Sequence, residues 1–245
     1  HLEHRRQRQM CIRDSTRSIK KRIQALEKLD SSITTNESRI FEALKKDLNK
    51  SNFESYLTEI AILKSEIKLI KKKLNKWSKP KRVKSTLASF PSKDYLLLEP
   101  YGITLIISPW NYPFQLALLP LISSIAAGNT VVIKPSEHSP NTSKLIKEII
   151  SNIFVEDYVK VILGDSKVAT KLLELRWDYI FFTGSVNVGK IVAKAASKFL
   201  TPVTLELGGK NPCIIDKNTD VKLTAKRLIW GKFVNAGQTL SLIHI

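Results

Sequence analysis

A regular alternation of short apolar strands with helical segments, beginning after Tyr101, constrains the fold of this chain more than any other feature. Residues 103–107 form a continuous apolar run, typical of a strand buried on both faces of a parallel sheet. Helical segments follow each strand and lead to the next; Gly128 ends the first of them and Pro140 opens the second. The expected strands are 103–107, 130–133, 159–163, 179–182 and 203–207. Repeated strand–helix units of this length predict right-handed crossovers and an α/β fold with a doubly wound parallel sheet, Rossmann-like in type.

The region before the sheet is helical. Apolar residues recur at helical spacing from Thr16 to about Trp77, which predicts three amphipathic helices that pack on something else, with Asn36 as N-cap of the second. Residues 78–92 contain two prolines and several lysines and indicate a connecting segment, and a strand over 94–99 follows. We therefore divide the chain into N-terminal helices with a bridging strand (16–100) and the sheet domain (101–235). A short strand at 212–216 and a helix capped by Asp220 complete the expected elements.

The two ends differ from the rest. Residues 1–15 carry no periodicity and residues 241–245 are equally out of character, so we expect a non-native leader over 1–15 and a foreign or misassembled origin for both ends. Only Cys11 and Cys213 are cysteines, which are too few for a disulfide framework and fit a reducing cytoplasm. The four histidines are scattered, so no metal site is expected. No apolar run approaches the roughly 18 residues needed to cross a membrane, so no membrane partner is expected for this chain.

The net charge of +18 raises the possibility of a nucleic-acid partner. The lysines, however, fall mostly at solvated helix positions, and no aromatic–basic interleaving, zinc-finger pattern or basic zipper is present. A lysine-rich solvated surface explains the charge better. We expect no nucleic-acid partner and keep a basic nucleic-acid binder as a rival class.

Unusual residues follow each expected strand, at the carboxyl ends where such sheets bind ligands. After the first strand, Asn111 lies between Pro109 and Pro113; its side-chain amide can donate to a developing oxyanion, or can simply cap a helix. After the second strand, Lys134 and Glu137 can hold two sugar hydroxyls, or can form a surface ion pair.

The last two strands end in glycines. Gly184 and Ser185 precede a helix whose N-terminal N–H groups and dipole suit an anion, although a capped helix explains them equally well. Glu206 lies between Leu205 and Leu207 and is followed by a glycine pair. We expect Glu206 to be buried, which would raise its pKa towards the range of a general base; a satisfied structural carboxylate is the alternative.

Taken together, these motifs resemble the aldehyde dehydrogenase superfamily, and its class 3 branch in particular. The resemblance runs from about Arg22 to Thr239 and rests on order and spacing as well as composition. The matching segments are residues 109–114 (PWNYPF), 134–137 (KPSE), 182–185 (FTGS), 205–210 (LELGGK) and 237–239 (GQT), with 201–204 (TPVT) and 230–233 (WGKF) pointing to class 3.

The resemblance implies an enzyme that oxidises an aldehyde to a carboxylic acid with NAD or NADP, through a thiohemiacetal and a thioester on a cysteine. It implies that Asn111 stabilises the oxyanion and that Glu206 activates the cysteine or the water. Lys134 and Glu137 would hold the adenosine ribose. The remaining cofactor-binding residues implied are Gly184 and Ser185 at the pyrophosphate, Val188 beside the adenine, its neighbour Gly189, and the Leu207 carbonyl near the carboxamide.

The sequence departs from the family at one position that matters. The family places its cysteine directly after Gly-Gln-Thr, where this chain has Leu240. Cys213 falls on the expected strand at 212–216, and we interpret it as a small buried hydrophobe. Residues 236–245 therefore look like the truncated start of a catalytic domain. We expect that this chain does not oxidise aldehydes. A non-catalytic nucleotide-binding module is the alternative, and the full-length parent is expected to be a homodimer.

Overall fold

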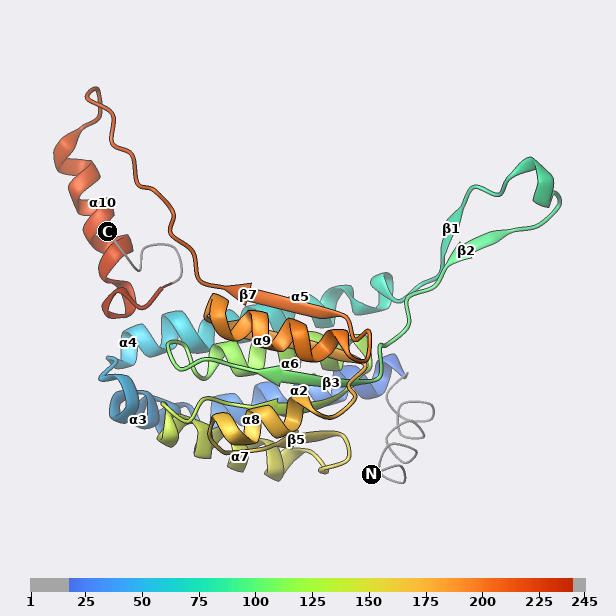
Figure 1. Cartoon of the computed structure of the whole chain (residues 1–245), viewed down its shortest axis with the longest axis horizontal. Helices are drawn as coiled ribbons and strands as arrows, with labels where there is room; N and C mark the ends of the chain where they lie inside the picture. The colour runs from blue at the N-terminus through green and yellow to red at the C-terminus, as the bar shows by residue number, and fades with distance from the viewer. Residues whose placement is uncertain (1–17, 240–245) are drawn as a thin grey trace.

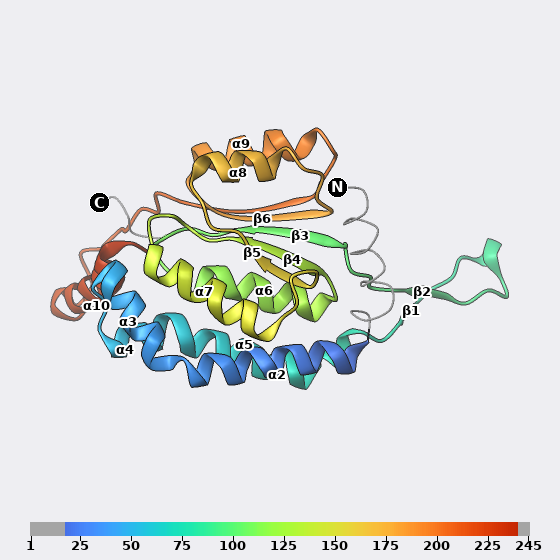
Figure 2. The ribbon, with the colours of Figure 1, turned by 90° about the horizontal axis from the view of Figure 1, so that it is seen from below.

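The computed structural model describes residues 18–239, so the expected leader, the C-terminal residues 241–245 and Leu240 lie outside the described residues. The described chain forms layers around one parallel sheet, with helices on both of its faces (Figures 1 and 2). A hairpin projects from one end of these layers, and the C-terminal helix lies at the other end.

The sheet confirms the predicted fold class. Its five strands are all parallel and lie in the order β5-β4-β3-β6-β7. The chain runs outward from the central strand β3 in one direction and then in the other, as a doubly wound sheet does. The strands are β3 (Ile103–Ile107), β4 (Thr130–Lys134), β5 (Val159–Val161), β6 (Tyr179–Gly184) and β7 (Val203–Leu207).

Helices cover both faces of the sheet. Helices α6 (Gln115–Ala127) and α7 (Pro140–Ile153) lie on one face, and α8 (Ser166–Leu173) and α9 (Val186–Ser197) lie on the other (Figure 2). Every residue of β3 and β4 is buried, which explains why these two strands read as continuous apolar runs. The two strands predicted to be buried on both faces of the sheet are therefore buried in the structure.

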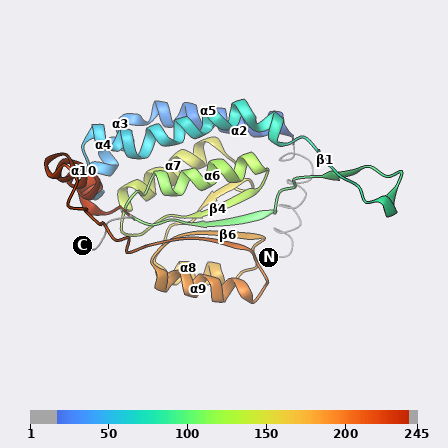
Figure 3. The same cartoon turned by 90° about the horizontal axis from the view of Figure 1, so that it is seen from above.

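The N-terminal helices form a further layer outside α6 and α7 (Figure 3). The helices are α2 (Ile19–Thr35), α3 (Glu37–Leu48), α4 (Asn52–Ser55) and α5 (Ala61–Trp77), and a π-helical turn, η2 (Tyr56–Ile60), joins α4 to α5. Helices α2 and α5 contact α6, and α3 contacts α7, so the prediction that they pack on something else is confirmed. Asn36 stands at the start of α3, but its side-chain amide donates to the Ser32 carbonyl instead of capping that helix.

Local signals for helix ends are borne out. Gly128 ends α6 in a left-handed conformation with φ of 91°, which a residue with a Cβ adopts with difficulty. Asp165, Ser185 and Asp220 each accept a backbone N–H at the start of α8, α9 and α10 (Val221–Phe233), respectively.

Two expected strands differ in the structure. The strand at 94–99 is shorter, β2 (Asp94–Leu96), and pairs antiparallel with β1 (Lys81–Val83) in the projecting hairpin. The strand at 212–216 does not form, and Cys213 is exposed, so our interpretation of it as a buried hydrophobe is wrong. After Gly208 and Gly209 the chain leaves the edge of the sheet, and no neighbouring strand within 18–239 lies beside it to complete a ladder.

The C-terminal helix of the described chain makes little contact with the rest of the fold. Helix α10 buries none of its residues, and a short 3-10 segment, η4 (Val234–Gly237), follows it. No helix between residues 18 and 239 is both long and apolar enough to span a membrane.

Candidate functional site

The candidate site lies at the carboxyl edge of the sheet, where the loops after β3, β4, β6 and β7 meet. Ile107 pairs with Lys134 on one side and with Phe182 on the other, and Gly184 pairs with Leu207, so these strand ends are level. The winding direction reverses between β3 and β6, and such a switch point is where doubly wound sheets bind ligands.

Two buried hydroxyls flank that switch point. Ser108 follows β3 and Thr183 lies near the end of β6, and within the described residues neither hydroxyl oxygen has a hydrogen-bond partner. An unsatisfied buried hydroxyl costs free energy, so each is a candidate partner for a bound polar molecule.

Lys134 and Glu137 form an ion pair at the end of β4. The Lys134 side chain is 4% exposed and its Nζ lies 2.5 Å from Oε2 of Glu137, whose side chain is 32% exposed. Partial burial is the largest single influence on Glu137 and opposes its ionisation, but the hydrogen bond from Lys134, a backbone hydrogen bond and nearby positive charge together hold the pKa of Glu137 below its ordinary value. The structure thus shows an ion pair, but not the surface pair given as the alternative, because the lysine is buried and only the carboxylate is partly exposed.

The loop after β6 presents the start of a helix. Ser185 caps α9, its hydroxyl oxygen accepting the Val188 N–H at 3.3 Å. The first N–H groups of a helix have no intrahelical acceptor, so this end can bind an anion. Gly189 is buried, and a Cβ there would lie 2.6 Å from Cδ2 of Leu207, so glycine permits α9 to lie close to β7.

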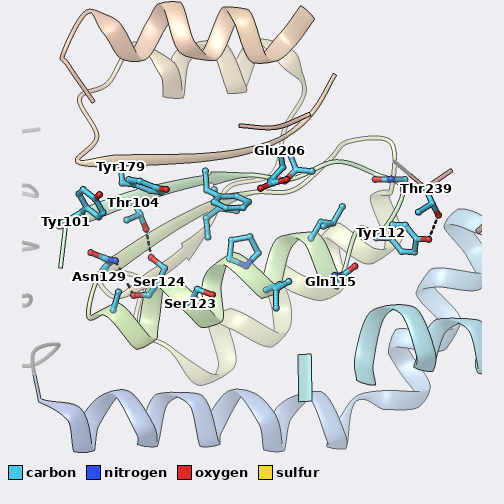
Figure 4. Close-up of a pocket in the computed structure, with 18 residues that line it drawn as sticks. Tyr101, Thr104, Tyr112, Gln115, Ser123, Ser124, Asn129, Tyr179, Glu206 and Thr239 are labelled. Carbon is cyan, nitrogen blue, oxygen red and sulfur yellow. Dashed lines mark hydrogen bonds between the residues drawn. The ribbon is translucent and has the colours of Figure 1, made fainter. Parts of the chain in front are cut away.

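Asn111 and Glu206 line one cavity, of about 650 Å³, between α6 and the sheet (Figure 4). The cavity extends from Tyr112 and Thr239 at one end to Tyr101 and Tyr179 at the other. Its lining is largely apolar and includes Ile106, Leu116, Leu119, Pro120 and Phe181. The structure therefore brings the two candidate catalytic side chains to the same space.

The surroundings of these two residues differ from what the sequence predicted. Glu206 is exposed, so the expectation that it is buried is wrong. Among residues 18–239, strand β7 lies at the edge of the sheet and pairs only with β6, and the leucines beside Glu206 are themselves only partly buried. Asn111 does not cap α6; its side-chain Nδ2 donates to the Gln238 carbonyl at 2.7 Å, next to Thr239.

Sequence reasoning missed a buried ion pair behind this loop. Lys50 and Glu59 lie beneath the segment from Asn111 to Gln115, with side chains 2% and 0% exposed. A signal was present, because Glu59 stands four residues before Leu63 on the apolar stripe of the third helix. A charge on such a stripe requires a buried partner.

Between residues 18 and 239, no three His, Cys, Asp or Glu side chains are grouped so that they could hold a metal ion. The available donors are hydroxyls, a lysine–glutamate pair and a helix N-terminus, which together suit a polyol and an anion better than a cation.

This fold defines an α/β protein with a doubly wound parallel sheet, a class of fold to which many dinucleotide-binding domains belong. The chain belongs to the aldehyde dehydrogenase family, whose model matches residues 11–243. It is 50% identical over 224 residues to 4,4'-diaponeurosporen-aldehyde dehydrogenase of Staphylococcus aureus, covering 91% of this chain and 49% of the relative. It is 46% identical over 235 residues to human aldehyde dehydrogenase family 3 member B1, covering 96% of this chain and 50% of that protein.

A solved structure gives the same result. The substrate-bound state of Staphylococcus aureus AldH superposes with a TM-score of 0.93 at 48% identity, covering 95% of this chain and 51% of the other. The resemblance to the class 3 branch is thereby confirmed, and members of the family bind NAD. The chain spans about half the length of the relatives it matches.

Proposed function

We propose that this chain is the cofactor half of an aldehyde dehydrogenase and binds NAD or NADP at the carboxyl edge of its sheet. One observation carries the proposal: the strand ends at Lys134 and Leu207 and the turn at Ser185 lie at the same edge of the sheet, next to a switch point, in a member of that family.

Each proposed contact suits part of a dinucleotide. Lys134 and Glu137 hold the adenosine ribose, because an ammonium donates to a hydroxyl oxygen and a carboxylate accepts from a hydroxyl. Gly184 and Ser185 meet the pyrophosphate at the start of α9, where the helix dipole favours negative charge. Val188 and Gly189 lie on the adenine side of the same turn, and the Leu207 carbonyl accepts from the carboxamide. The unpaired hydroxyls of Ser108 and Thr183 are available to the rest of the cofactor.

When bound in the longer protein, NAD or NADP would supply the hydride acceptor for oxidation of the thiohemiacetal carbon. The side-chain amide of Asn111 would donate to the oxyanion of the thiohemiacetal, and Glu206 would take a proton from the cysteine thiol or from the water that cleaves the thioester. The product is a carboxylic acid. The shared cavity supports this pairing of Asn111 with Glu206.

We further propose that the chain as written does not oxidise aldehydes. The reaction needs a thiolate to form the thiohemiacetal, and Leu240 stands where the family has that cysteine. Cys213 is exposed on the extended segment after β7 and is absent from the residues that line the cavity. The test is formation of reduced cofactor from NAD and an aldehyde. Turnover that scales with protein concentration and survives Cys213→Ala would show this proposal to be wrong.

Cofactor binding is tested by calorimetry with NAD on the purified chain. Lys134→Ala removes the buried donor, so we expect affinity to fall by roughly tenfold or more, the usual value of a hydrogen bond to a charged group. Lys160→Ala is the matched control, because Lys160 also pairs with a glutamate but on the surface. Equal affinity in Lys134→Ala and the unmodified chain would refute the assignment.

The rival classes separate in a simple experiment. A nucleotide-binding protein is stabilised against heat by NAD, and a basic nucleic-acid binder is stabilised by DNA. NAD at about 100 times its dissociation constant should add roughly 2.7 kcal/mol to the free energy of unfolding. A non-catalytic nucleotide-binding module would share this response, and only the activity assay on the longer protein distinguishes it.

Three broader assignments belong to the same proposal. The chain divides into helices with a bridging strand (16–100), the cofactor domain (101–235) and the start of a catalytic domain (236–245).

The longer protein is a homodimer. The exposed apolar side chains Leu87, Phe90 and Tyr95 on the projecting hairpin support this assignment, and sedimentation of that protein tests it. A cytoplasmic location is supported by the scarcity of cysteine and is tested by cell fractionation.

A further inference from the structure

A fully buried ion pair, which plays no part in the proposed cofactor site, supports the loop that carries Asn111. Lys50 follows α3 and Glu59 lies in the π-helical turn η2, and Nζ of Lys50 is 2.5 Å from Oε1 of Glu59. Their side chains are 2% and 0% exposed. π-Helical turns are rare and are found frequently at functional sites.

The contacts that the pair makes outside itself go to one short segment. Oε2 of Glu59 accepts the backbone N–H groups of Phe114 and Gln115, at 2.9 and 3.0 Å. Nζ of Lys50 lies 3.4 Å from the Asn111 carbonyl oxygen and 4.3 Å from the centre of the Tyr112 ring. The pair therefore makes hydrogen bonds at both ends of the segment from Asn111 to Gln115.

Glu59 replaces a cap that α6 lacks. Phe114 stands at the N-cap position of α6 and has no side chain able to accept the free N–H groups of the first turn. The carboxylate of Glu59 satisfies two of them from a different helix, and its negative charge is favourable at that end of the helix dipole. This contact fixes where α6 begins, four residues after Asn111.

A second tether fixes the Asn111 peptide from the opposite side. Asn235 is 5% exposed; its Nδ2 donates to the Asn111 carbonyl at 2.7 Å, and its backbone N–H donates to Glu54 at 2.6 Å. The Asn111 carbonyl thus receives two donors, while its side-chain amide points to the Gln238 carbonyl. The Asn111 peptide is therefore fixed by hydrogen bonds, and the Asn111 side-chain amide contacts the segment that precedes Leu240.

A buried ion pair is weak support for stability, since desolvation offsets most of its attraction and an apolar pair of the same shape often serves as well. Burial lowers the pKa of Lys50 and raises the pKa of Glu59, so each depends on the other to stay charged. What an apolar pair cannot do is accept two N–H groups and donate to a carbonyl. Its contacts therefore point to a geometric role.

We propose that Lys50 and Glu59 are a positioning pair that fixes the orientation of the Asn111 side-chain amide through the Asn111 peptide and the start of α6. Neither residue touches the proposed ligand; both act through Asn111. That this orientation serves an oxyanion rests on the proposed function, whereas the positioning itself does not.

The test is the double variant Lys50→Met/Glu59→Gln, which removes both charges and keeps similar volumes. We expect the variant to fold with a lowered melting temperature, because the glutamine introduced has one acceptor oxygen and leaves a backbone N–H of the Phe114–Gln115 pair less well satisfied. We expect hydrogen exchange at the Phe114 and Gln115 amides to accelerate by about tenfold or more, because a bond to a charged acceptor is lost. The ¹⁵N–¹H signal of the Asn111 side-chain amide, assigned by its absence in Asn111→Asp, should shift or broaden. The control Arg39→Met/Glu148→Gln, an exposed pair, should change neither signal.

Unchanged exchange and an unchanged Asn111 amide signal in a folded double variant would overturn the inference. If the double variant does not fold, the single variant Lys50→Met replaces it, because burial raises the pKa of Glu59 and lets it take up a proton, so that no charge is left buried. The Phe114 and Gln115 amides should still exchange faster, and no change at either amide would again refute the inference. NAD binding is measured on the same samples. If NAD fails to bind while the Asn111 signal responds, the proposed function fails and the positioning role stands.

Discussion

At the scale of single residues, burial changes the acidity of Tyr158. This side chain packs edge-on against Phe154, and burial raises its pKa from 10.0 to about 12, although the nearby Arg22 charge opposes the rise. Between these two pH values the unfolded chain has lost this proton and the folded chain keeps it. The contribution of Tyr158 to stability is therefore complete below pH 10 and falls by roughly 1.4 kcal/mol per pH unit above it.

Tyr158→Phe removes the ionisable group and so removes this dependence. Measured by denaturant unfolding from pH 10 towards pH 12, the free energy of unfolding of the variant should gain on that of the unmodified chain by up to about 2.7 kcal/mol. A constant difference between the two proteins over this range would contradict the prediction.

The candidate residues show how far sequence reasoning reaches at this scale. Lys134, Ser185 and Asn111 were found because each lies within four residues of the end of an apolar run, and the end of a strand can be predicted from local sequence. The burial of Glu206 was predicted wrongly, because an alternating strand does not reveal whether its neighbours cover it. The Lys50–Glu59 pair was missed because what it contacts, the segment from Asn111 to Gln115, lies far along the chain and is brought near only by the fold.

At the scale of elements, the start of β3 depends on Gly102. Its φ is +131°, and a Cβ there would lie 2.3 Å from the Asp178 carboxylate, which accepts the Ile103 N–H at 2.8 Å. Gly102→Ala must strain the backbone and displace this acceptor. We expect a loss of roughly 2 to 4 kcal/mol in the free energy of unfolding, from strain and a broken hydrogen bond.

Gly209→Ala is the matched control for this measurement. The nearest atom to a Cβ at Gly209 is 3.9 Å away, on the Asn211 side chain, so its effect on stability should stay within about 0.5 kcal/mol. Similar denaturation midpoints for the two glycine variants would show that the argument from backbone conformation is wrong.

The elements themselves were largely predictable, for a physical reason. The buried strands β3 and β4, and the caps at Gly128, Ser185 and Asp220, depend on local spacing and local hydrogen bonds. The strand expected at 212–216 failed because a strand needs a partner, and the chain leaves the edge of the sheet after Gly209.

At the scale of the whole molecule, the layers form one packed body from which two segments stand apart. The hairpin with its loop, residues 81–96, projects at one end, and the chain from Gly208 to Asp220 leads away from the sheet to α10 at the other (Figure 1). Both segments are exposed almost throughout. Protease cleavage requires locally unfolded backbone, so within the described residues both segments should be cut before the helices are.

Trypsin cleaves after lysine and arginine, and both exposed segments contain lysines, one group of them close to the proposed cofactor site. Lys84 and Lys93 lie in the hairpin loop, and Lys210 and Lys217 lie in the segment after β7, all exposed and outside helices. Bound NAD would contact Leu207 and order the chain beyond it, so NAD should slow cleavage at Lys210 severalfold while leaving cleavage at Lys84 unchanged. Mass spectrometry of timed digests, with and without NAD, measures both rates in one sample. Equal slowing at Lys84 and Lys210 would indicate general inhibition of the protease, and no slowing at either site under saturating NAD would place the cofactor away from the end of β7.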